Sequence, residues 1–123
     1  MRDLIFRAYN PIVDRFQQFS LQDIEKKKDQ IQWHILKIDQ YTGLRDSKGR
    51  KIFENDIVEF SCERYYDSDP KVPTTKTFIS QVKYIEAAFI ISETQEDDTF
   101  LCAFNNECII KGNIHRNKEL LEK

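Results

Sequence analysis

Apolar and polar residues alternate along much of this chain, which is the pattern of β-strands with one buried face. Residues 2–9 alternate in this way, and Asn10-Pro11 ends the strand because proline cannot donate a hydrogen bond to a sheet. The two faces of this strand are Leu4, Phe6 and Ala8 on one side and Ile5, Arg7 and Tyr9 on the other. The pattern therefore predicts a first strand over residues 2–9.

The segment from Phe16 to Ile38 has a less regular pattern. Helical spacing fits part of residues 16–24, so the period of this segment is ambiguous, and a charged, solvated connector is expected to follow over residues 25–29. The apolar residues Ile31, Trp33 and Ile35 then give way to Leu36 and Ile38. A β-bulge near Leu36 would explain this change of phase. Trp33, with aliphatic neighbours at period 2, is expected to anchor the core.

The clearest signals lie in residues 40–60 (QYTGLRDSKGRKIFENDIVEF), where two tight turns precede a strand over residues 57–60. Asp46-Ser47-Lys48-Gly49 predicts a type I turn in which the Asp46 carboxylate accepts backbone N–H groups and Gly49 has positive φ. In the second turn Asn55 is expected in the left-handed region, with Asp56 holding N–H groups of that turn. Gly43 marks a further reversal of the chain.

Two readings stay open for residues 63–77, which contain two prolines and several turn-forming residues. One is a long recognition loop in which Arg64, Tyr65 and Tyr66 contact a partner, because long loops are often functional. The other is an ordered extension of the preceding strand.

Farther on, the pattern predicts alternating strands and turns. The expected strands are residues 78–85, 88–92, 99–104 and 107–111, with turns at Glu86-Ala87 and Asn105-Asn106 and an acidic loop over residues 93–98. Asn117 is expected to cap a short helix over residues 118–122. Leu120 and Leu121 of this helix would cover one end of the fold or contact a second subunit.

Three stretches of this sequence resemble the YopX family of phage and prophage proteins, and they occur in the family's order. They are MRDLIFRAY at residues 1–9, QYTGLRDSKGRKIFENDIV at residues 40–58, and IKGNI at residues 110–114 followed by ELL at residues 119–121. The chain departs from the family pattern at Asn55 (usually Gly), His115 (usually aromatic) and Lys118 (usually Pro). The resemblance implies a mainly β protein with an SH3-like small β-barrel, and it implies no established activity. We therefore expect an N-terminal β-meander over residues 1–39 and a barrel with a short C-terminal helix over residues 40–123. Because the resemblance makes residues 16–24 part of this meander, we favour strand and turn over helix there.

The composition fits a small globular protein. The chain has 123 residues, 40% of them hydrophobic and 33% charged, and a net charge of −2. A dedicated nucleic-acid-binding protein is usually basic, so this balance argues mildly against that role. Three cysteines without paired spacing, and no apolar run near ~18 residues, lead us to expect a soluble protein in the bacterial cytoplasm with no membrane association.

The sequence contains no recognisable catalytic or metal-binding motif, so we expect a non-enzymatic protein without metal or cofactor. His34 and His115 are expected to be packing or surface residues, because neither lies in a nucleophile motif. Cys62, Cys102 and Cys108 lack the paired spacing of a zinc site. The stretch from Gly43 to Gly49 lacks the Gly-Lys-Ser/Thr ending of a phosphate-binding loop, and the acidic stretch at residues 93–98 lacks the spacing of an EF-hand.

These observations favour a binding module over an enzyme. The leading hypothesis is protein binding through loops, strand edges and surface aromatics, with homo-oligomer formation through an edge strand or the C-terminal helix. Its aromatic candidates are Tyr9, Tyr41, Tyr65, Tyr66 and Tyr84. The alternative is a nucleic-acid-binding barrel that uses the basic hairpin at residues 45–51. Its contacts would be Arg45, Lys48, Arg50 and Lys51, with Tyr41 or Phe53 as a stacking surface. The plainer interpretation, in which these basic residues only solubilise a turn, is favoured over that alternative.

Overall fold

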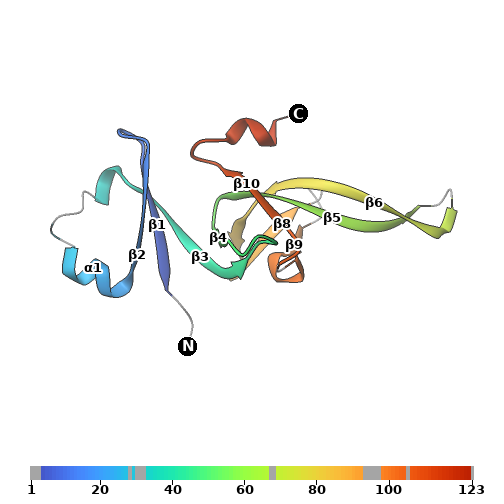
Figure 1. Ribbon diagram of the computed structural model, residues 1–123, viewed down its shortest axis with the longest axis horizontal. Helices are drawn as coiled ribbons and strands as arrows, with labels where there is room; N and C mark the ends of the chain where they lie inside the picture. Colours follow the sequence, from blue (N-terminus) through green and yellow to red (C-terminus); the bar gives the residue numbers. More distant parts are fainter. Residues whose placement is uncertain are drawn as a thin grey trace.

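The structure, a computed structural model, describes residues 4–27, 29, 33–66, 69–92, 98–104 and 106–122. It is mainly β, as predicted, with one short α-helix and three 3-10 helices among the described residues (Figure 1). The strands are β1 (Ile5–Asn10), β2 (Arg15–Ser20), β3 (Lys37–Arg45), β4 (Lys51–Phe53), β5 (Asp56–Tyr66), β6 (Asp69–Gln81), β7 (Lys83–Ile85), β8 (Ala88–Ser92), β9 (Asp98–Phe100) and β10 (Ile109–Asn113). The helices are α1 (Leu21–Lys27), η1 (Trp33–Ile35), η2 (Leu101–Phe104) and η3 (Lys118–Leu121).

The first sheet has the order β2-β1-β3-β4 and is antiparallel throughout. In its register Phe6 is opposite Phe19 and Tyr9 is opposite Phe16, and both cross-strand ring pairs are in contact. β3 runs from Lys37 to Arg45 and so passes through the boundary expected at residues 39 and 40. The division into two subdomains stays a prediction.

Between β2 and β3 the described residues include two helical segments, where strand and turn were expected. Residues 21–27 form α1, because Ser20 and Asp23 make a reciprocal cap: the Asp23 carboxylate accepts from the Ser20 N–H and hydroxyl, and the Ser20 hydroxyl accepts from the Asp23 N–H. This helix contains residues 25–27 of the predicted connector. The expected strand with a β-bulge near Leu36 is also wrong, since Trp33–Ile35 form a 3-10 helix. The apolar pattern changes phase near Leu36 because the 3-10 helix ends there and β3 begins.

Trp33 was expected to be a core anchor, but its side chain is 39% exposed. One edge of the indole contacts the ring of Phe19 at a centroid distance of 6.0 Å. Trp33 therefore caps the outer side of the N-terminal sheet and is only half-buried.

The long β5–β6 hairpin projects from the body of the molecule (Figure 1). Its register extends from the Ile57–Gln81 pair to the Tyr66–Asp69 pair. Residues 63–66 and 69–77 therefore form strands and not a long loop, as the ordered extension of the strand predicts. A contact role for Arg64, Tyr65 and Tyr66 stays a prediction. Residues 67–68 at the tip lie outside the described residues.

The main core lies under β4, β5 and β8. Its buried members are Ile52, Val58, Phe60, Cys62, Val82, Ile91, Leu101 and Cys108. The strands around it form two further sheets of order β10-β5-β6 and β7-β8-β9. Val82 separates β6 from β7 and exchanges backbone hydrogen bonds with the turn before β5, to Asn55 and Asp56. The sheets of the described residues are not closed, so the fold is mainly β and the SH3-like barrel is not confirmed.

The last elements differ in detail from the predictions. The expected strand over residues 99–104 is instead β9 followed by the 3-10 helix η2, and the acidic loop at residues 93–97 lies outside the described residues. The C-terminal helix is a 3-10 helix, and Asn117 does not cap it: its Oδ1 accepts from the Asn113 N–H at 3.2 Å. A Cβ at Gly112 would collide with the Asn117 side chain, so a glycine is required where these two segments meet.

Candidate functional site

The turn between β3 and β4 is built around the buried side chain of Asp46. Its carboxylate accepts hydrogen bonds from the N–H groups of Lys48 and Arg50, the Nε of Arg50 and the N–H of Ile110, at distances of 2.8–3.2 Å. Gly49 closes the turn with a φ of +79°. Burial raises the pKa of Asp46, but the hydrogen bonds from Arg50, Ile110 and Lys48 outweigh it and hold the pKa below its usual value. The basic turn is thereby fixed to β10.

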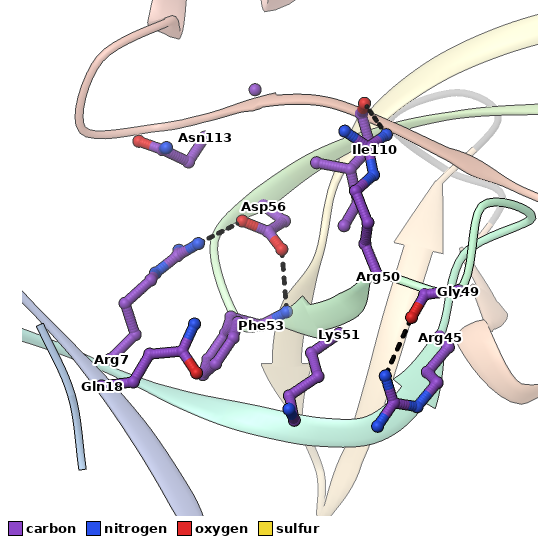
Figure 2. Close-up of a pocket in the computed structure, with 11 residues that line it drawn as sticks. Arg7, Gln18, Arg45, Gly49, Arg50, Lys51, Phe53, Asp56, Ile110 and Asn113 are labelled. Atoms are coloured by element: carbon purple, nitrogen blue, oxygen red, sulfur yellow. Dashed lines mark hydrogen bonds and ion pairs between the residues drawn. The ribbon is translucent and has the colours of Figure 1, made fainter. Parts of the chain in front are cut away.

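A pocket of about 450 Å³ lies beside this turn (Figure 2). Arg7 and Gln18 are on one side of it, and Arg45, Arg50 and Lys51 are on the other. The remaining lining residues are Gly49, Phe53, Asp56, Ile110, Gly112 and Asn113. Strands β1, β2, β3, β4 and β10 therefore all contribute to one pocket, which we call the basic pocket.

Arg45 and Lys51 are directly opposite each other in the β3–β4 register. Cross-strand partners project from the same face, and like charges in this arrangement destabilise a sheet. Arg45 donates to the Gly49 carbonyl at 2.8 Å. Within the part of the chain that the structure describes, Lys51 makes no hydrogen bond or ion pair.

Arg7 lies at the base of the pocket and is only 8% exposed. Its guanidinium donates to Asp39 through Nε (3.2 Å) and Nη2 (2.8 Å), and to Asp56 through Nη1. The rings of Phe16 and Phe53 lie 5.2 and 4.9 Å from its Cζ. One arginine thus joins β1 to β3 and to the start of β5, in the paired form that a buried charge requires.

The Asp56 carboxylate has both oxygens in use. Besides Arg7, it accepts from the Phe53 N–H at 2.8 Å. Burial raises the pKa of Asp56, and Arg7 and the Phe53 N–H offset only part of this effect. Each oxygen of Asp56 therefore already has a donor within the protein, and one of these donors is a cation.

The segment after β10 closes onto the N-terminal sheet. The Nε2 of His115 is 2.8 Å from the Asp39 carboxylate, and its ring stacks on Tyr9 at a centroid distance of 5.0 Å. Arg116 donates to Asp14, which also accepts from the Tyr9 hydroxyl. These contacts join residues 102 positions apart in the chain.

The sequence-predicted contact residues are only partly brought together. Arg45, Arg50 and Lys51 line the pocket, whereas Lys48 is exposed outside its lining. Tyr41 and Phe53 are 5% and 3% exposed and pack against each other, so neither presents a ring face for stacking. Arg64, Tyr65 and Tyr66 lie in β5, and their side chains are outside the description.

The turn residues occupy the positions expected of them. Gly43 and Asn55 have φ values of +87° and +70°. Asn55 also donates to Asp39 and accepts from Gln81, at 2.8 Å each. Of the tyrosines considered as surface contacts, Tyr9 is buried and Tyr84 is 52% exposed.

Sequence reasoning missed Arg7, Asp39 and His115 as a connected group. The available signal was a single arginine within the apolar run Ile5-Phe6-Arg7-Ala8-Tyr9, because a buried arginine requires carboxylate partners. Asp39 and Asp56 carried no local mark that would identify them as those partners. His115 was judged a packing or surface residue, and it packs on Tyr9.

A second concave surface lies on the β7-β8-β9 sheet and is mostly apolar. It encloses about 480 Å³ and is lined by Ile85, Glu86, Ala88, Ile90, Thr99 and Phe100. Phe100 is 62% exposed and Ile85 44% exposed.

The described residues hold no group of three or more His, Cys, Asp or Glu side chains arranged for a metal ion. None of the helices in the described ranges combines the length and the apolar composition needed to cross a lipid bilayer.

Comparison with known proteins gives a family and a fold. The model of the YopX protein family matches residues 5–122, nearly the whole chain, and the chain belongs to that family. The crystal structure of protein EF1440 from Enterococcus faecalis is similar, with a TM-score of 0.59 and 17% sequence identity over 97% of this chain and 98% of that one. At this identity the likeness shows the fold alone. No curated protein matches this chain significantly.

Proposed function

We propose that this member of the YopX family is a non-enzymatic binding module, and that it holds a negatively charged group of its partner in the basic pocket. The observation that carries the proposal is the balance of donors and acceptors in the lining. Arg45, Arg50 and Lys51 line one side of the pocket, and of these Arg50 already donates to Asp46 through Nε and to the Ile110 carbonyl through Nη2. The one carboxylate in the lining, Asp56, is satisfied internally by Arg7 and Phe53.

The polar side chains without charge add further donors. Asn113 uses its Oδ1 to accept from the N–H groups of His115 and Arg116, which leaves its amide nitrogen to donate. The side chain of Gln18 makes no hydrogen bond to a described residue. A site lined in this way attracts an anion and repels a cation.

The environment of the candidate nucleophiles and bases supports a non-enzymatic role. Burial, with the charge of Asp46, raises the pKa of the Cys108 thiol to about 11, so the reactive thiolate is scarce at neutral pH. His115 is held between Asp39 and the Tyr9 ring. The free state of all three cysteines is consistent with the reducing cytoplasm of a host bacterium.

The test is an NMR titration of isotope-labelled protein with three anionic probes, namely a short oligonucleotide, a short poly-glutamate peptide and inorganic phosphate. We expect the amide signals of Gly49, Lys51 and Asn113 to move with at least one probe. Lys51→Glu should abolish or strongly reduce the shifts, and Arg45→Glu/Lys51→Glu should abolish them. Lys83→Glu, which makes the same charge change as Lys51→Glu but on exposed β7, should preserve them. If no probe moves the pocket signals, the proposal is wrong.

A second candidate function, self-association, is favoured by the exposed apolar residues of the β7-β8-β9 sheet. β9 is an edge strand, and edge strands pair readily with the same strand of a second copy. Phe100, at the end of β9, would lie in such an interface. Light scattering should then give a dimer at tens of micromolar that Phe100→Glu dissociates, and a strict monomer of the unmodified protein would end this candidate.

A further inference from the structure

We infer that the group bound in the basic pocket is the phosphodiester of a nucleic-acid strand. This inference deepens the proposed function and rests on it. It differs from a general basic surface on the turn, because Lys48 at the tip is outside the lining and Gln18 and Asn113 are inside it.

The first argument is the direction of the donors. They belong to four different strands: Gln18 to β2, Arg45 to β3, Lys51 to β4 and Asn113 to β10. Figure 2 shows them around the pocket and not on one side of it. The oxygens of a tetrahedral phosphate group accept hydrogen bonds from several directions, whereas the two oxygens of a carboxylate lie in one plane and accept mainly within it. This lining therefore suits a phosphate oxyanion better than an acidic side chain.

The second argument is the Arg45–Lys51 pair. Two like charges directly opposite each other destabilise a sheet. An anion bound over this pair offsets the repulsion and contacts both side chains at once. A turn that needed only solubility gains nothing from this placement.

The described lining of the pocket provides no contact that would distinguish one nucleotide base from another. The nearest rings, Tyr41 and Phe53, are buried, so bases have no stacking surface here. Contacts to phosphate alone position a strand without recognising bases. With a chain net charge of −2 and one pocket, about two or three phosphates are engaged, and affinity is weak, with a dissociation constant of about 10⁻⁴ M.

The test measures fluorescence anisotropy of short labelled single strands, one of thymidines and one of mixed sequence, at 50 and 200 mM salt. Two or three phosphate contacts predict a loss of affinity of about 7- to 20-fold between these conditions. The two strands should bind alike. Lys51→Gln should weaken binding several-fold and lower the salt slope by about 0.7. Lys83→Gln, on β7, should change neither value.

Competition separates this inference from the proposed function. Unlabelled poly-glutamate peptide and inorganic phosphate are added at equal anion concentration. If either binds the pocket while the strand does not, the phosphodiester inference is overturned and the anion-binding proposal stands. If strand binding survives Arg45→Glu/Lys51→Glu, the strand binds elsewhere and the inference is likewise overturned. Failure of all three probes to bind overturns both.

Discussion

Replacement of Arg7 should test the buried network more directly than any other change. Arg7→Met keeps much of the side-chain volume against Phe16 and Phe53 but removes the charge. Asp39 would still accept from Asn55 and approach His115, whereas Asp56 would keep only the Phe53 N–H. Asp56 is 2% exposed, so its charge would be left in the interior without a cation.

Breaking a buried ion pair by removing one partner costs about 3–5 kcal/mol, because the other charge stays buried. We expect Arg7→Met to lose free energy of unfolding in this range. With a urea dependence of about 1.5 kcal/mol per molar, the unfolding midpoint should fall by about 2–3 M. Such a loss is a large part of the ~5–15 kcal/mol that stabilises a small protein. Arg7→Lys, which keeps the charge but loses the fork to two carboxylates, should cost less and provides a folded variant if Arg7→Met does not fold.

The assay is equilibrium unfolding in urea, followed by far-ultraviolet circular dichroism and by fluorescence of Trp33, the only tryptophan. Arg15→Met on exposed β2 is the matched control and should stay within about 0.5 kcal/mol of the unmodified protein. Asp56→Asn in the Arg7→Met background removes the unpaired buried charge and should raise the free energy of unfolding above that of Arg7→Met alone. A cost below about 1 kcal/mol for Arg7→Met, or a double variant no more stable than the single one, would refute the reasoning.

Three further predictions concern other parts of the fold. Asp46→Asn should lower the free energy of unfolding by about 2 kcal/mol at pH 7. Because the folded pKa of Asp46 is depressed, the stabilisation by its carboxylate is present above about pH 4 and is lost as pH falls through the folded pKa. Urea unfolding at pH 3 should therefore show a smaller difference between the variant and the unmodified protein. At pH 8 a thiol reagent should label exposed Cys102 quickly and leave Cys108, whose pKa is raised to about 11, unlabelled until urea unfolds the chain; equal rates would contradict this. Gly112→Ala should cost about 1–3 kcal/mol in urea unfolding through its collision with Asn117, and less in an Asn117→Gly background, which removes all three Asn117 atoms that the added Cβ would meet.

What could be predicted from the sequence was local. The turn at Asp46–Gly49, the positive φ of Asn55 and the pairing of residues 57–60 into a strand each depend on residues a few positions apart. Such features follow from backbone preferences that any similar segment would share. The helix α1 was equally local, because its Ser20-x-x-Asp23 cap and part of its helical spacing were present in the sequence. The expectation of strand and turn there followed from the family resemblance instead.

The features that could not be predicted depend on residues far apart in the chain. Arg7 meets Asp56 across 49 positions, and Arg116 meets Asp14 across 102. Nothing in the neighbourhood of either residue identifies its partner. The apolar run around Arg7 indicates a buried arginine that requires carboxylates, but it does not indicate which carboxylates these are. The same limit applies to Trp33 and Tyr41. Trp33 was expected in the core and is 39% exposed, whereas Tyr41 was expected to offer a surface contact and is buried against Phe53 of β4.

The basic pocket combines both kinds of information. Its turn and its three basic residues from the β3–β4 hairpin were visible in the sequence, but a solubilising role accounted for them equally well. The position of β1, β2 and β10 around the hairpin favours the binding role over the solubilising one. It places the amide groups of Gln18 and Asn113 across the pocket from the hairpin, and it pairs the Asp56 carboxylate with Arg7. A solubilising turn needs no opposite wall. The charges of this hairpin therefore acquire a candidate function only through long-range packing, and the Arg7 network that creates the packing is the part of the site that variants should probe first.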